Sequence, residues 1–238
     1  MSLVHTSTYV LAVLGLVAAT CIAADTAVPS NLPADYKGTP FSDEKYKDGA
    51  QKIPGIVMPA YYDVGGEGVA FHVSYKTNLG SNGLNKGGNS YNDKFRRDEA
   101  ISISYTKGFA DFWEGEAVQP PHDMLYVGCT EAGEWLNMTV NVADAGTYTV
   151  DLLSTCNHGA VISFDVNGKP LGKDIDIPST ADPKDGTAWR QWHHWALNKN
   201  IAEMTLPKGL SVITLHVVKE GNMNLGQLIF TAKTAAAK

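Results

Sequence analysis

Short runs in which apolar and polar residues alternate recur along most of the chain, separated by turns rich in glycine, proline or asparagine. They lie at 68–73, 100–105, 135–142, 148–154, 161–166, 202–206, 211–218 and 225–231. A period of two predicts β-strands with one buried face, and no segment shows the longer period of an amphipathic helix. The pattern predicts an all-β protein, an antiparallel β-sandwich of the jelly-roll type.

The spacing of these runs also predicts how the chain is divided. Residues 25–52 are polar, contain proline and have no periodicity, which predicts an extended N-terminal arm. The sandwich is expected over 53–231, followed by a tail at 232–238. Between 74 and 123 the sequence is rich in glycine, asparagine and aromatic residues, and loops of such length in compact domains often carry function.

The first residues are typical of an export signal. An apolar run at 10–19 is followed by small residues up to Ala24, which predicts a signal peptide over 1–24. The run is about half of the ~20 residues that a membrane span needs, so we expect a secreted, extracellular protein without a membrane anchor. A lipid on Cys21 fits less well, because Thr20 precedes it and the leader has neither Lys nor Arg.

Composition and charge exclude several functions. The chain has 238 residues, 44% hydrophobic and 18% charged, which is typical of a folded protein. Lys plus Arg number 19 against 25 Asp plus Glu, without a basic cluster, so nucleic-acid binding is not expected.

The sequence also lacks the usual signatures of an enzyme. It has no Gly-x-Ser-x-Gly elbow, phosphate loop, dinucleotide fingerprint or His-Glu-x-x-His pair. On a strand, His193 and His194 would point to opposite faces, which disfavours a shared metal. Carboxylates for glycoside hydrolysis exist, but their separation cannot be read from sequence; they are Glu67, Glu114, Glu131 and Glu134. We expect a protein without catalytic activity.

Two cysteines remain after the leader, and two interpretations stay open for them. If 134–142 and 147–155 form a β-hairpin with Val142 opposite Thr147, Cys156 lies opposite Gly133 and within reach of Cys129. A disulfide between Cys129 and Cys156 is then geometrically reasonable in an exported protein. The alternative is two separate buried thiols.

Three tryptophans follow a glycine-containing loop at spacings of three residues: Trp189, Trp192 and Trp195. On a strand, Trp189 and Trp195 share one face and Trp192 takes the other. An exposed indole is a natural platform for the apolar face of a sugar ring, but aromatic residues also dominate cores. Either role fits the pattern.

The sequence resembles family 6 carbohydrate-binding modules, and more broadly modules of the family 6 and 35 type. The central motif is YVGCTEAGEWLNMTVNV at 126–142, followed by AGTYTV at 145–150. Other segments resemble the family in the same order: IPG at 53–55, GGEGVAFH at 65–72, DVNG at 165–168, the segment 189–192, LPKG at 206–209 and NMNL at 222–225. The resemblance implies a galactose-binding-domain-like sandwich that binds glycans without catalysis.

The resemblance also implies where a glycan would bind. In the family, two aromatic rings clamp a sugar and an asparagine bonds its hydroxyls, at the loops of one end of the sandwich. Trp189 matches one ring and Asn224 matches the asparagine, whereas the other ring falls on Cys129, which cannot stack. The candidates to replace that ring are Tyr126 and, in the enlarged loop, Tyr91, Phe112 and Trp113.

Two further expectations concern a metal and a glycan. The family carries a Glu-Ala-Glu motif that contributes to a structural calcium site, and the matching residues here run from Met58 to Ala60 without a carboxylate. We expect this calcium to be lost or weakened and no cofactor to be present. Asn137 begins an Asn-x-Thr sequon, which fits N-glycosylation as well as it fits a hydrogen-bonded strand residue.

These observations favour a secreted, non-catalytic, lectin-like protein that recognises a plant or microbial polysaccharide. The alternative is an extracellular structural or interaction protein that keeps the fold but has lost sugar binding. The residue at the clamp position, Cys129, favours this second hypothesis.

Overall fold

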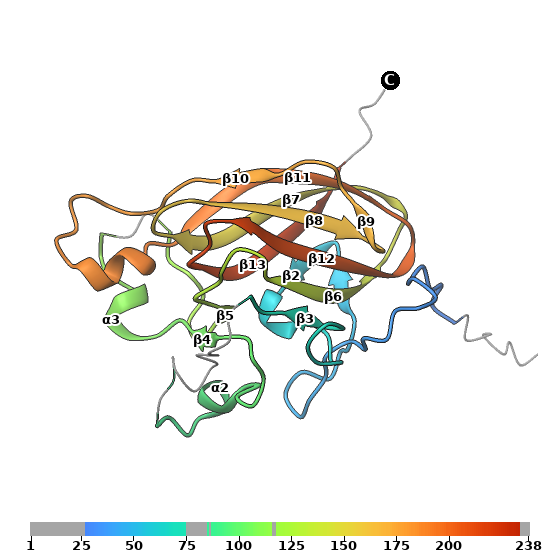
Figure 1. The fold of residues 1–238 in the computed structure, drawn as a ribbon, viewed down its shortest axis with the longest axis horizontal. Helices are drawn as coiled ribbons and strands as arrows, with labels where there is room; N and C mark the ends of the chain where they lie inside the picture. The colour runs from blue at the N-terminus through green and yellow to red at the C-terminus, as the bar shows by residue number, and fades with distance from the viewer. Residues whose placement is uncertain (1–26, 75–84, 86, 116–117, 234–238) are drawn as a thin grey trace, which may run out of the picture.

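Two β-sheets packed face to face make up most of the molecule (Figure 1). The computed structural model describes residues 27–74, 85, 87–115 and 118–233. The predicted signal peptide at 1–24 and the last residues of the predicted tail lie outside the described residues.

The first sheet has seven strands, of which five follow one another in space. Their order is β1 (Gln51–Ile53), β6 (Trp135–Val142), β12 (Gly209–Lys219), β8 (Ala160–Val166) and β10 (Ile175–Ile177). In addition β3 (Phe71–His72) pairs with β6, and β9 (Lys169–Pro170) pairs with β8. Only β1 runs parallel to its neighbour among these pairs.

The second sheet has six strands, all in antiparallel pairs. The order is β11 (Ala196–Leu206), β7 (Gly146–Cys156), β13 (Met223–Ala232), β5 (Leu125–Val127) and β4 (Ile103–Tyr105), with β2 (Gly55–Val57) on the far part of β13. The helices of the described residues are single turns: η1 (Pro59–Tyr61), α2 (Tyr91–Lys94), α3 (Gly108–Asp111) and η2 (Ala188–Trp192). None of the described helices is long and apolar enough to span a membrane.

Side chains that alternate along the strands form the core between the sheets. In β6, Leu136, Met138 and Val140 are buried against residues such as Leu152 of β7 and Phe230 of β13. Burying a side chain of this size contributes about 1.5–3 kcal/mol to stability. The structure confirms the predicted all-β antiparallel sandwich, and each of the eight predicted runs contains a strand.

The predicted hairpin between residues 134–142 and 147–155 is wrong. The first segment is β6 in the seven-stranded sheet, and the second is β7 in the six-stranded sheet. The turn at 143–145 therefore carries the chain from one sheet to the other. Alternating strands around a turn fit a hairpin and a crossing between sheets equally well, because both leave one face of each strand buried.

The predicted disulfide is also absent, since Cys129 and Cys156 are both free thiols. A strand of the six-stranded sheet lies between the two segments: Gly221 bridges to Glu131 on one side, and Met223 pairs with Cys156 on the other. Segments separated by one strand lie about 10 Å apart. A disulfide needs Cα atoms within roughly 7 Å, so the intervening strand keeps the thiols apart.

The described part of the N-terminal segment packs on the sandwich. Ser30 bridges to Leu210, and the backbone N–H of Leu210 donates to the carbonyl of Pro29 at 2.7 Å. The approach requires a glycine at position 209, whose φ is +100° and where a Cβ would lie 2.1 Å from the Pro29 carbonyl oxygen. Further along, Phe41 is buried in the core.

Candidate functional site

The loops at one end of the sandwich bring together two short helical turns, α3 and η2 (Figure 1). Trp189 stands in η2 with 54% of its side-chain surface exposed, and Phe109 stands in α3 with 63% exposed. The strand geometry considered for the three tryptophans does not apply to Trp189, because residues 188–192 form a 3-10 turn. The turn separates the tryptophans: Trp195 is buried, whereas Trp189 faces solvent.

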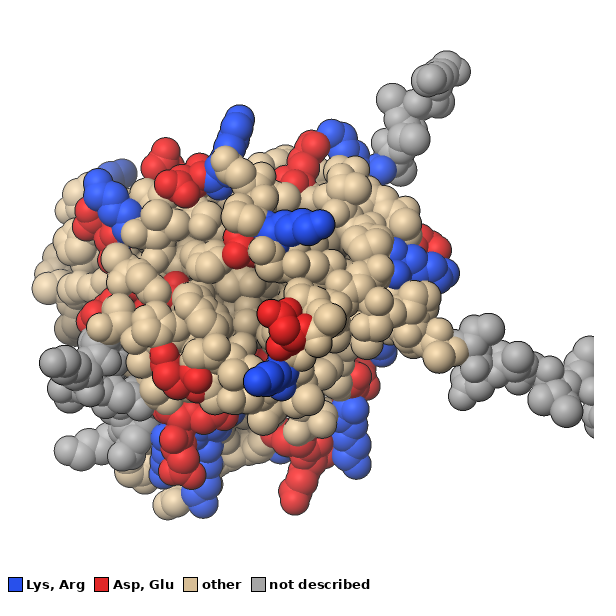
Figure 2. All heavy atoms as spheres, turned by 45° about the vertical axis from the view of Figure 1, so that its right-hand side comes forward, with Lys and Arg blue, Asp and Glu red and all other residues tan. Residues whose placement is uncertain are grey.

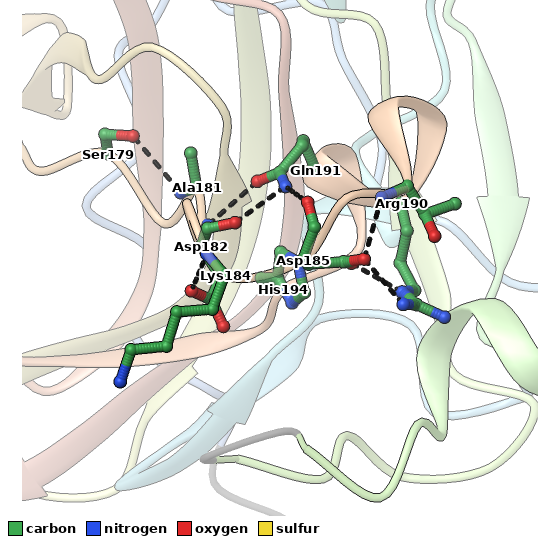
Figure 3. A network of polar contacts seen from close by, with 9 residues as sticks. Ser179, Ala181, Asp182, Lys184, Asp185, Arg190, Gln191 and His194 are labelled. Atoms are coloured by element: carbon green, nitrogen blue, oxygen red, sulfur yellow. Dashed lines mark hydrogen bonds and ion pairs between the residues drawn. The ribbon is translucent and has the colours of Figure 1, made fainter.

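A buried ion pair closes the loop that carries Trp189 (Figure 3). The Arg190 guanidinium donates from Nε to Asp185 Oδ2 at 2.5 Å and from Nη2 to Asp185 Oδ1 at 2.6 Å. His194 Nε2 lies 3.0 Å from the same Asp185 Oδ2. Hydrogen bonding from Arg190 holds the pKa of the Asp185 carboxyl well below its usual range. The carboxylate is therefore ionised throughout the neutral and mildly acidic range.

A second set of contacts braces the same loop through its backbone. The Gln191 side chain donates to the carbonyls of Asp182 and Asp185, each at 2.8 Å, and accepts from the Asp182 N–H at 2.8 Å. These bonds join both ends of residues 182–191 (Figure 3). Together with the ion pair they give Trp189 a rigid support.

The guanidinium of Arg190 also packs against aromatic rings. Its Cζ lies 4.1 Å from the ring centroid of Trp113 and 5.1 Å from that of Phe109. Cation–π contacts of this kind are worth about 0.5–2 kcal/mol. Trp113, a predicted site residue, is half-buried and supports Arg190 from the enlarged loop region.

Asp111 ties α3 to the chain that follows η2. Its Oδ1 lies 2.9 Å from His193 Nδ1 and accepts from Trp195 Nε1 at 2.9 Å, while its Oδ2 accepts from the Lys107 N–H at 2.8 Å. The carboxylate is almost fully buried. Because burial of a charge requires such partners, these bonds fix α3 beside the tryptophan loop.

Asn224 lies in β13 beneath the end of η2 and is only 7% exposed. Its Nδ2 donates to the Trp192 carbonyl at 2.7 Å, and Thr155 Oγ1 donates to the same oxygen at 2.8 Å. The amide nitrogen predicted to bond a ligand is thus engaged in holding the turn.

Tyr126 does not replace the missing clamp ring. It is 5% exposed and packs edge-on against Trp195, with centroids 5.5 Å apart. Cys129, at the clamp position, is partly buried at a φ of +52°. Of the other candidates, Phe112 stacks on His122 and Tyr91 donates to Asp43. All of these rings are less exposed than that of Phe109.

Sequence reasoning missed four residues of this site. Asp185 and Arg190 flank Trp189 with opposite charges five residues apart, a signal that was readable in the sequence. Phe109 and Asp111 had no such signal, because the enlarged region offers several aromatic and acidic residues and only the fold selects among them.

The sequon residue Asn137 lies within β6. Its Nδ2 donates to the Val69 carbonyl at 2.8 Å, and its Oδ1 accepts from Thr214 Oγ1 at 2.6 Å. Thr139, the third sequon residue, is buried and donates to Asp63. These contacts favour the interpretation of Asn137 as a hydrogen-bonded strand residue.

The segment that matches the family's calcium motif does not fit a calcium ion. It brings no carboxylate, and the carbonyls of Met58 and Tyr61 accept from Gln51 Nε2 at 3.2 and 3.4 Å. Arg96 donates to the carbonyls of Tyr62 and Asp63. Calcium needs 6 to 8 oxygen ligands, and these oxygens already have donors. Over the described ranges, no group of three or more His, Cys, Asp or Glu could hold a metal ion.

Three of the four glutamates considered for hydrolysis lie near one another, and of these Glu134 is buried. Burial, with further contributions from Glu131 and Glu67, raises the pKa of Glu134 to about 7. Glu134 lines a cavity of only about 10 Å³ among apolar side chains. Such a space holds at most one water molecule and cannot admit a sugar.

Charges of both signs are interspersed on the face of the molecule shown in Figure 2. The view shows no continuous basic stripe among the coloured side chains. A protein that follows a phosphate backbone needs such a stripe, so this face does not provide one.

No family model and no curated protein matches this sequence. Among solved structures, the chain is similar to CsCBM6-3 from Clostridium stercorarium in complex with cellobiose, at 15% identity and a TM-score of 0.45, covering 78% of this chain and 99% of that one. A carbohydrate-binding module of Cellvibrio mixtus lichenase 5A, in complex with cellotriose, has 21% identity and a TM-score of 0.38, covering 57% and 98%. A family 35 module from Clostridium thermocellum has 18% identity and a TM-score of 0.40, covering 55% and 88%.

Proposed function

We propose that this chain is a secreted, non-catalytic, lectin-like protein that binds a plant or microbial polysaccharide through Trp189. The observation that carries the proposal is the Trp189 indole, which is more than half exposed on a turn. Side-chain hydrogen bonds of Arg190 and Gln191 to Asp185 hold that turn. A sugar ring presents an apolar face that an exposed indole covers, while its hydroxyls stay in contact with water. A rigid platform loses little side-chain freedom on binding, which favours affinity.

The family resemblance supports the same surface, with one change of role. The segment 189–192 and the Asn224 segment fall where the family places its glycan site; the first lies in η2, and Asn224 of β13 bonds to the end of that turn. Because Asn224 Nδ2 bonds the Trp192 carbonyl, we assign to this residue the positioning of the turn. Binding by one exposed face and a few hydrogen bonds should be modest, with a Kd between micromolar and millimolar, roughly 4–8 kcal/mol.

Affinity electrophoresis tests the proposal. The mature protein is run through gels that contain xylan, mixed-linkage glucan, β-1,3-glucan, soluble cellulose derivatives or galactan. We expect retardation by one of these polymers and loss of that retardation in Trp189→Ala. The matched control is Ile56→Ala, because Ile56 is 49% exposed on β2, outside the tryptophan loop. Unchanged retardation of Trp189→Ala, with circular dichroism showing an intact fold, would refute the assigned platform.

The second candidate is a structural or interaction protein that has lost sugar binding. The partly buried Cys129 at the clamp position favours it, since a two-sided clamp cannot form there. Failure of every polymer to retard the wild-type protein would support this candidate and remove the first.

A further inference from the structure

Phe109 is the most exposed large apolar side chain of the residues that the structure describes, at 63%. It lies in α3, within the enlarged region, and no sequence motif points to it. One exposed ring alone needs no functional explanation, but the Phe109 ring packs on the guanidinium of Arg190, the residue that follows Trp189.

Two sets of contacts link the turns α3 and η2, which carry Phe109 and Trp189. Arg190, the residue after Trp189, holds its Cζ 5.1 Å from the Phe109 ring centroid. The Trp189 ring lies 6.2 Å from that of His193, and His193 Nδ1 lies 2.9 Å from Asp111, two residues after Phe109. Because Arg190 and Asp111 are themselves buried and bonded, they hold together the two turns that carry the rings.

The surroundings of the two rings are polar. Lys107 precedes α3, and the exposed Glu114 and Lys184 lie on the adjoining loops. The other exposed large apolar side chains are on different segments: Val28, Ile56, Val64, Leu171 and Val218. Two isolated rings among polar groups suit a ligand with apolar ring faces and many hydroxyls better than the continuous apolar core of a protein interface.

We propose that Phe109 is a second stacking ring, so that Trp189 and Phe109 together bind two sugar units of one chain. This rests on the function proposed above. Since both rings are more than half exposed, the surface is open and leaves room for a polysaccharide chain to continue beyond them. Arg190 contacts the Phe109 ring as a positioning residue, because its charge is already paired with Asp185.

Ligand length separates the two rings experimentally. A short ligand occupies only the Trp189 ring, whereas a longer one also covers Phe109. Isothermal titration with cello-, xylo- and laminari-oligosaccharides, from disaccharide to hexasaccharide, measures this for the wild type, Trp189→Ala and Phe109→Ala. Leu171→Ala is the matched control, an exposed apolar residue on another loop.

We expect Phe109→Ala to bind the shortest ligand as the wild type does and the hexasaccharide about fivefold to tenfold more weakly, the loss that one exposed ring contact typically causes. Trp189→Ala should lose binding at every length. A Phe109→Trp variant should keep the length dependence, which separates a stacking role from a folding role.

Equal binding of Phe109→Ala and Leu171→Ala at every length, or equal weakening at every length, would overturn the second ring. If Trp189→Ala still loses binding, the proposed function survives that result. Absence of binding by the wild type to all these oligosaccharides and to the polymers above would remove both proposals. Preserved binding in Trp189→Ala would remove the platform and with it the second ring.

Discussion

Arg190 and Asp185 form a bidentate, buried ion pair across the four residues 186–189, which include Trp189. The ion pair joins the two ends of a glycine-containing loop, and hydrogen bonds of the Gln191 amide hold the same loop. Its strength matters because an exposed indole is a useful platform only if its backbone is held in place. The buried charges of Asp185 and Arg190 therefore hold the exposed side chain of Trp189 in position.

Substituting Asp185→Asn should loosen this loop. The amide keeps the shape of the carboxylate but leaves the Arg190 charge buried without a counter-charge, which is strongly destabilising in proteins. We expect Tm to fall by several degrees and polysaccharide retention to weaken. Because the pKa of Asp185 is lowered in the fold, its stabilisation is present above the unfolded pKa of ~4 and is lost as pH falls below it.

Calorimetric scans between pH 8 and pH 3 check this prediction. The difference in Tm between wild type and Asp185→Asn should stay constant down to pH ~4 and diminish below it. Asp176→Asn, an exposed residue of β10, is the control and should behave as the wild type. A difference that vanishes already at pH 7 would contradict the ionised, buried pair.

Glu134 gives the opposite dependence on pH. Its pKa of about 7 in the fold lies above the unfolded value of ~4.3, so the fold prefers the protonated acid. Stability from this group is complete below pH ~4.3 and is lost as pH rises through 7. We expect Glu134→Gln to raise the free energy of unfolding by about 2–3 kcal/mol at pH 8 and hardly at all at pH 4.

Urea unfolding at the two pH values measures this effect. Glu44→Gln changes an exposed carboxylate and should leave the free energy of unfolding unchanged at both pH values. If Glu134→Gln destabilises the protein equally at pH 4 and pH 8, the hydrogen bond from the Glu131 N–H contributes more to stability than burial of the Glu134 charge costs.

The sequence predicted features that depend on neighbouring residues, and it did not predict features that depend on residues far apart in the chain. Alternation along β6 or β12 is a local pattern, and it predicted the strands well. Which sheet a strand joins depends on distant partners, so β6 and β7 were wrongly paired. At the site, Trp189 was predicted from its own segment. The position of Phe109 depends instead on α3, which Asp111 ties to the chain just after η2, more than seventy residues further along the sequence.

Removal of divalent metal should leave stability unchanged. Gln51 accepts from the Met58 N–H at 2.7 Å and donates to the carbonyls of Met58 and Tyr61, so a side-chain amide bonds groups that a cation would otherwise coordinate. We expect the same Tm with EDTA and with millimolar calcium, and a loss of about 1–3 kcal/mol in Gln51→Ala, because buried backbone groups lose their partner. A rise in Tm on adding calcium would contradict this expectation.

Asn224→Ala should separate positioning from stacking. It removes one of two donors to the Trp192 carbonyl, and Thr155 retains the other. We expect a loss of about 1 kcal/mol in stability and a partial loss of retention, smaller than in Trp189→Ala. Thr155→Val is the matched variant and should have a similar effect. Complete loss of binding in Asn224→Ala with unchanged stability would instead assign Asn224 to direct contact with the ligand.

The two thiols should be free and differ in reactivity. Burial raises the pKa of both Cys129 and Cys156, so each reacts slowly with Ellman's reagent in the folded protein at neutral pH. Cys129 is partly exposed and Cys156 is fully buried, so Cys129 should react first. Protein produced without residues 1–24, unfolded in urea without reductant, should give two thiols per chain, and Cys129→Ser should give one. No thiol in the unfolded wild type would show a disulfide and contradict the strand arrangement that keeps the two residues apart.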